Sequence, residues 1–155
     1  MIRRVTEADV PAVVELVHAL ARYEKAPEQC HLTEPQLREA LFGESPAVFG
    51  HVAEVDGEVV GFSLWFLNFS TWEGVHGIYL EDLFVRPEHR GSGLGKALLQ
   101  ELARECARRG YARLEWSVLD WNEPSINFYK AAGAVPMDGW TTFRLTGSAL
   151  RDFAG

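Results

Sequence analysis

The sequence predicts a mixed α/β sandwich, with helices packed on a sheet in one domain that covers residues 1–155. Segments with helical spacing alternate with short β-rich runs, and no repeat, low-complexity tract or linker separates them. The length gives a second argument, because 155 residues with 47% hydrophobic side chains are enough for one core and too few for two.

The N-terminal part predicts a strand followed by two helices. Ile2–Val5 forms the strand, and apolar residues recur at helical spacing from Asp9 onwards. Arg22–Glu28 breaks this spacing and predicts a loop. Thr33–Gln36 has the spacing of a capping box and predicts a second helix that ends at Gly43.

The middle of the chain predicts a β-hairpin and a further strand. Val48–Val55 and Glu58–Leu67 are apolar, β-rich runs joined by Asp56-Gly57, a dipeptide typical of two-residue hairpin turns. Asn68–Gly77 is polar and contains glycine, so we expect a loop, and Ile78–Val85 resumes strand character.

The C-terminal part predicts two more helices and two more strands. Gly93–Arg109 places apolar residues on one helical face, and Gly110 ends this helix. Arg113–Val118 alternates apolar and polar residues and predicts a strand. The segment from Asn122 to Gly133 predicts a short helix, and Thr141–Leu145 predicts a last strand that pairs back into the sheet.

The excess of acidic over basic residues limits the classes of molecule that the protein is expected to bind. A formal net charge of -7 and a pI near 5.2 oppose nucleic-acid binding, which normally needs an excess of Lys and Arg, and favour a cationic substrate. No apolar run reaches the roughly 18 residues of a membrane span, and the first ten residues lack an apolar signal core. We therefore expect a cytoplasmic protein with no nucleic-acid or membrane partner.

Cysteine and histidine spacing gives no sign of a metal site. Cys30 and Cys106 lie far apart outside any CxxC pattern, so free thiols are expected. The five histidines show no HxxxH spacing or pairing with carboxylates, and we predict no bound metal.

The most informative segment is a glycine-rich turn between a predicted strand and a predicted helix. Gly91, Gly93 and Gly95 leave room near the backbone, and the first N–H groups of the helix have no intrahelical partner. Together with Arg90 and Lys96 they predict a phosphate site. The pattern is neither a dinucleotide fingerprint nor a P-loop, and a turn that only eases packing remains an alternative.

This segment resembles motif A of the GNAT acetyltransferase superfamily, in which the turn holds the pyrophosphate of coenzyme A. Tyr79–Val85 and Trp121–Lys130 (WNEPSINFYK) resemble the spermidine/spermine N-acetyltransferase family, and Arg22–Glu24 and Gly61-Phe62 extend the similarity to nearly the whole chain. The resemblance implies a GNAT-like three-layer sandwich with a central, mostly antiparallel, twisted sheet flanked by helices. It also implies acetyl-CoA as co-substrate, a small-molecule amine as acceptor and a homodimer.

The resemblance assigns roles to individual side chains. Tyr129 would be the general acid that protonates the leaving thiolate, and a phenol suits this role because it stays protonated at pH 7. Spacing alone favours the alternative that Tyr129 packs its helix on the sheet, and the match of the flanking residues reverses this preference. The residues expected to contact the cofactor are Phe84, Val85, Arg90, Gly91, Ser92, Gly93, Leu94, Gly95, Lys96, Asn122, Ser125 and Tyr129. For Asn122 and Ser125, helix capping is an alternative.

An amine of pKa near 10 arrives protonated and must lose a proton before it attacks a thioester. The resemblance makes Glu81 the base, acting through water, and Asp82 a ligand of the substrate amine. As neighbours on a strand they are expected to project to opposite faces, so they would not form a dyad. Capping or pairing within the sheet is the alternative for either residue.

Substrate choice depends on residues that the resemblance places around the amine. Glu24, Trp72 and Asp82 match the family's amine pocket, where an aromatic face beside carboxylates suits a cation. Ser70-Thr71 stands where polyamine-acetylating members carry Asp-Pro, and resembles the thialysine-acetylating branch. We therefore expect thialysine or a lysine-like diamino acid as substrate. The alternatives are a polyamine acetyltransferase, a protein-amine acetyltransferase and a non-catalytic acyl-CoA-binding module.

Overall fold

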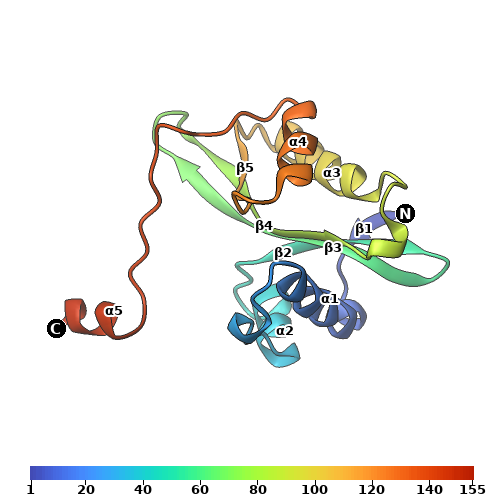
Figure 1. Ribbon diagram of the computed structural model, residues 1–155, viewed down its shortest axis with the longest axis horizontal. Coiled ribbons are helices and arrows are strands. Elements are labelled where there is room, and N and C mark those ends of the chain that lie inside the picture. The colour runs from blue at the N-terminus through green and yellow to red at the C-terminus, as the bar shows by residue number, and fades with distance from the viewer. The chain divides into compact units, whose positions relative to one another are not determined.

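The computed structural model describes residues 1–155 and divides into two units, Met1–Ser117 and Val118–Gly155. The first unit contains one sheet of five strands in the order β1-β2-β3-β4-β5 (Figure 1). Its strands are β1 (Ile2–Arg4), β2 (Phe49–Val55), β3 (Glu58–Ser70), β4 (Val75–Val85) and β5 (Leu114–Trp116). The three pairs from β1 to β4 are antiparallel, and β4 and β5 are parallel.

Helices cover both faces of this sheet (Figure 1). Helices α1 (Val10–Tyr23) and α2 (Glu34–Phe42) lie on one face, and α3 (Leu94–Arg109) lies on the other. Three short 3₁₀ turns accompany them: η1 (Glu7–Asp9), η2 (Pro27–Gln29) and η3 (Pro87–His89). The predicted three-layer sandwich with a mostly antiparallel sheet is therefore confirmed.

Each face of the sheet has its own core. On the α1 side, Val13 and Leu16 pack with Phe62, Leu64 and Phe84, all buried. On the α3 side, Leu98 packs with Ala53 and Val85. Because Phe84 and Val85 are consecutive, the end of β4 is fixed from both faces, which positions the turn that follows.

The local sequence signals produce the expected turns and caps. Thr33 and Gln36 form a capping box at the start of α2, where the Gln36 N–H donates to the Thr33 hydroxyl and the Thr33 N–H donates to Gln36 Oε1 at 3.0 Å. Asp56-Gly57 joins β2 to β3 with positive φ at both residues, as a two-residue hairpin turn requires. Gly110, at φ 72°, ends α3.

Two predicted elements were wrong. The predicted loop Asn68–Gly77 is only the four-residue turn 71–74, because β3 and β4 continue on either side of it and stay paired to Ser70 and Val75. The predicted last strand, Thr141–Leu145, is absent: the sheet contains β1 to β5 only, and these residues are exposed and irregular. A β-rich composition does not make a strand without a hydrogen-bonded neighbour.

The second unit, Val118–Gly155, contains helices α4 (Glu123–Ala131) and α5 (Gly147–Ala154). The sequence predicted α4 and missed α5. A single domain over the whole chain stays a prediction. No helix in the structure is both long and apolar enough to cross a membrane.

Candidate active site

The glycine-rich turn leads from η3 into the N-terminus of α3. Gly91 and Gly93 adopt φ of 82° and 85°, in the left-handed region that favours glycine, and a Cβ atom at either position would meet no atom within 4 Å. Gly95 has a different role, because its Cβ position lies 3.9 Å from Leu83 and 4.0 Å from Val85. The turn therefore leaves open space above Gly91 and Gly93, and Gly95 sits against the sheet.

The start of α3 offers backbone donors. Gly93 is the N-cap residue and supplies no side chain, so no side chain caps the helix. The amides of the first turn, including those of Leu94, Gly95 and Lys96, have no intrahelical acceptor. Ser92 instead directs its hydroxyl to the His89 carbonyl within the turn. Open space and unpaired amides at a helix N-terminus are the features that suit a phosphate group.

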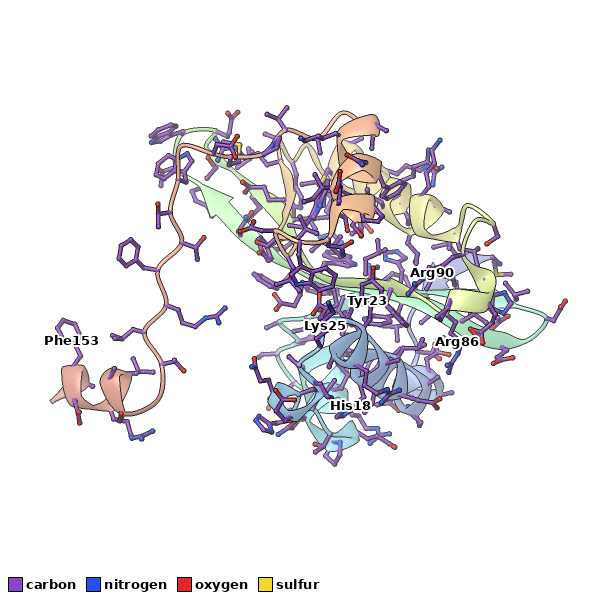
Figure 2. The ribbon with its side chains drawn as sticks, viewed as in Figure 1. His18, Tyr23, Lys25, Arg86, Arg90 and Phe153 are labelled. Carbon is purple, nitrogen blue, oxygen red and sulfur yellow. The ribbon has the colours of Figure 1, made fainter.

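Arg90 lies folded against the sheet (Figure 2). Its Nε donates to the Val85 carbonyl at 3.0 Å, and its guanidinium lies 5.0 Å from the Tyr23 ring centre and 5.2 Å from that of Phe84. These contacts fix the positive charge beside the glycine turn. They also join the end of α1, through Tyr23, to the end of β4.

The second half of β4 has no partner on one edge. The parallel ladder with β5 ends at the pair Leu80 and Trp116, so no strand pairs with Glu81–Val85 on that side. A register shift also occurs on the β3 side, where Leu64 pairs with Asp82 and Trp65 pairs with Leu80. Glu81 is thus the extra residue of a β-bulge.

The bulge interrupts the regular strand on which one prediction about the two acids depends, so opposite faces for Glu81 and Asp82 stay a prediction. Opposite faces for Glu81 and Asp82 were expected because side chains alternate along a regular strand. Leu80 and Asp82, two residues apart, pair with consecutive residues of β3, so the alternation is interrupted at Glu81. Glu81 is exposed and Asp82 is half-buried.

Asp82 and Glu24 line the same cavity, of about 210 Å³, between α1, η2 and β4. Its lining residues are Val17, Leu20, Ala21, Glu24, Ala26, Gln29, Cys30 and Asp82. Burial, together with the nearby charges of Glu81 and Glu24, raises the pKa of Asp82 to about 7. Partial burial also raises the pKa of Glu24. A cation that enters this cavity would stabilise the charged form of both carboxylates and so lower their pKa values.

The residues Ser70, Thr71 and Trp72 lie elsewhere in the first unit. Ser70 is six residues along β3 from Leu64, the partner of Asp82, which is about 20 Å at about 3.3 Å per residue. The Ser70 hydroxyl accepts from the Glu73 N–H at 3.1 Å, and Trp72 is 82% exposed. The structure therefore brings Glu24 and Asp82 together and does not bring this turn to their cavity.

The second unit holds the remaining predicted residues. Asn122 is buried and is the N-cap of α4, where its Oδ1 accepts from the Ser125 N–H at 3.4 Å. Capping, one of the two roles considered for this pair, is thus confirmed. Tyr129 lies half-buried on α4 beside Phe128, with ring centres 5.5 Å apart.

Three residues near these groups were not singled out from the sequence: Tyr23 as a support for Arg90, and Gln29 and Cys30 in the cavity wall. The motif Arg22-Tyr23-Glu24 could have indicated Tyr23. Nothing in the spacing of Gln29 and Cys30 connects them to Asp82, which lies far along the chain on β4. No group of three or more His, Cys, Asp or Glu side chains is placed to hold a metal ion.

Comparisons with known proteins show which sequences and structures the chain resembles. Residues 14–134 match the model of the acetyltransferase (GNAT) family. The chain is 40% identical to the thialysine N-epsilon-acetyltransferase of Bos taurus over 100% of its own length and 97% of that protein. It is 31% identical to the L-ornithine N5-acetyltransferase of Arabidopsis thaliana, over 97% and 86%.

Among solved structures, an integron cassette protein from the mobile metagenome of V. cholerae superimposes with a TM-score of 0.84. Its sequence is 27% identical, and the match covers 99% of this chain and 96% of that one.

Proposed function

The chain belongs to the acetyltransferase (GNAT) family and is an N-acetyltransferase, and we propose that it acetylates the side-chain amine of thialysine or another lysine-like diamino acid. The two relatives described above carry the names of thialysine and ornithine acetyltransferases, and both of those substrates are diamino acids. The observation that carries the proposal is the small cavity in which Glu24 and Asp82 meet.

The size and charge of this cavity support a small cation. About 210 Å³ is below the range of about 300–1,000 Å³ for pockets of drug-sized ligands. A carboxyl with a pKa of about 7 beside a second acid stays partly protonated until a positive group arrives. An ammonium group satisfies both requirements, whereas a protein substrate would need a longer groove.

Acetyl-CoA would supply the acetyl group as an activated thioester. The amides at the start of α3, above Gly91 and Gly93, would hold its diphosphate, with Arg90 adding positive potential and Lys96 close by in the first turn. The unpaired edge of β4 from Glu81 to Val85 carries amides that could hold a carbonyl oxygen.

The proton transfers would be performed by two residues of the chain. Glu81 would accept a proton from the attacking amine, through water, at its exposed carboxylate on the bulge. Tyr129 would donate its phenolic proton to the departing sulfur. Asp82 and Glu24 would hold the substrate's second cationic group and fix the position of the amine. A homodimer and a cytoplasmic location belong to the same proposal.

The test is a substrate panel with acetyl-CoA, followed by the release of free thiol. Thialysine, lysine and ornithine should be turned over with the highest kcat/KM, ahead of putrescine, spermidine and a peptide with a free N-terminus. A preference for spermidine would make the protein a polyamine acetyltransferase, and a preference for the peptide would make it a protein-amine acetyltransferase. Coenzyme binding without turnover of any amine would refute catalysis.

A further inference from the structure

One cavity residue has no role in the mechanism described so far. Among the eight side chains that line the cavity, Gln29 is the only one that carries N–H donors. The others are aliphatic groups, two carboxyl groups and the thiol of Cys30, and no Lys, Arg or His is present. The cavity therefore provides strong acceptors for a cation and a single amide for an anion.

The backbone of Gln29 is fixed and its amide is available. Gln29 ends the 3₁₀ turn η2, where its N–H donates to the Ala26 carbonyl at 3.1 Å, and Cys30 N–H donates to the Pro27 carbonyl at 3.3 Å. The side-chain amide of Gln29 makes no hydrogen bond within the chain. The contrast is Gln36, whose amide is used in the capping box of α2.

A diamino acid and a diamine differ at the end that enters this cavity. Both present an ammonium group to Glu24 and Asp82, but the diamino acid also brings an α-carboxylate. Two nearby acids repel that carboxylate, so its binding needs a donor at the same place. Gln29 is the one lining side chain that can supply an N–H donor.

We propose that Gln29 determines specificity for diamino acids by donating a hydrogen bond to the α-carboxylate of the substrate in the Glu24–Asp82 cavity. This inference rests on the proposed function and adds a residue to it. A hydrogen bond to a charged group contributes enough to change kcat/KM by roughly 10- to 100-fold. The difference would discriminate lysine-like amino acids from diamines of the same length.

The experiment uses three acceptors that differ only at this end: lysine, lysinamide and cadaverine. The variant Gln29→Glu replaces the donor by a carboxylate of the same shape. It should lower kcat/KM for lysine by at least about tenfold, through KM. Lysinamide and cadaverine, which lack the carboxylate, should be acetylated at least as well as by the unchanged protein. Gln29→Ala should lower the preference for lysine in the same direction and by less.

Gln100→Glu is the matched control, because it makes the same change at an exposed position of α3, on the opposite face of the sheet. It should leave all three kcat/KM values unchanged. An equal fall for all three acceptors in Gln29→Glu, or an unchanged preference for lysine, would overturn the role of Gln29 and leave the proposed function intact. Failure of the unchanged protein to acetylate any diamino acid would overturn both.

Discussion

Replacing Asp82 by Asn should change how the stability of the protein depends on pH. Burial and the neighbouring acids raise the pKa of Asp82 from its usual 3.8 to about 7 in the folded protein. Between these two values the folded state binds more protons than the unfolded state, so the free energy of unfolding falls as the pH rises. The unfavourable contribution of Asp82 begins above pH 4 and is complete above pH 7.

The structure sets the size of this effect. One pKa unit corresponds to about 1.4 kcal/mol, so the difference between 3.8 and about 7 corresponds to about 4 kcal/mol at most. Asp82 is only half-buried, and solvent screening reduces this value to about 2 kcal/mol. Asp82→Asn removes the titration and keeps the shape of the side chain.

Urea unfolding of both proteins at pH 4.5 and pH 8 measures the effect as a double difference. Relative to the unchanged protein, Asp82→Asn should be more stable at pH 8 than at pH 4.5 by about 2 kcal/mol. Asp56→Asn, at the exposed turn between β2 and β3, is the control and should give no such difference. The same stability difference at both pH values would refute the idea that Asp82 is held in a desolvated, acidic cavity.

Three further outcomes are expected. Tyr129→Phe should lower kcat by roughly 10²- to 10⁴-fold and leave acetyl-CoA affinity nearly unchanged, as measured by calorimetry and thiol release; normal turnover would remove Tyr129 from the mechanism. Gly93→Val should weaken acetyl-CoA binding at least about tenfold, because a β-branched residue strains the left-handed backbone and fills the space above the turn. Gly95→Ala is its control, since that Cβ meets only ordinary contacts, and equal losses in both variants would contradict the distinction. Trp65→Ala should cost about 3–5 kcal/mol in urea unfolding because Trp65 is fully buried; a loss below about 1 kcal/mol would count against its place in the core.

Local patterns predicted most of the first unit. The capping box at Thr33, the Asp56-Gly57 turn and Gly110 each act through a few neighbouring residues, so their effect can be predicted from the sequence. The segment Thr141–Leu145 has the β-rich composition of a strand but forms none. A strand needs a hydrogen-bonded partner elsewhere in the chain, which local composition does not predict. The error over Asn68–Gly77 has the opposite origin: pairing between β3 and β4 extends into residues whose composition favours a loop.

In the candidate site, too, features set by neighbouring residues were predicted and those that depend on distant parts of the chain were not. The glycine turn was predicted, since Gly91 and Gly93 are needed for a backbone conformation that the sequence itself indicates. The meeting of Glu24 with Asp82 in one cavity was suggested only by family resemblance, because the two residues are brought together by the packing of α1 on the sheet. The place of Gln29 in the cavity wall could not be predicted from the sequence, because it depends on how η2 packs near β4.

The bulge in β4 adds one residue to a strand whose pairing with β3 is otherwise regular. Leu80 and Asp82 are opposite Trp65 and Leu64, two consecutive residues of β3, as they would be in an unbroken ladder from which Glu81 had been removed. Shortening β4 by this single residue would therefore keep both halves of the strand in register, with the same side chains towards α1 and α3. Glu81 is in this sense an exposed addition to a complete strand, so its side chain can be replaced without a change in the pairing of β3 with β4 or in the hydrophobic interior.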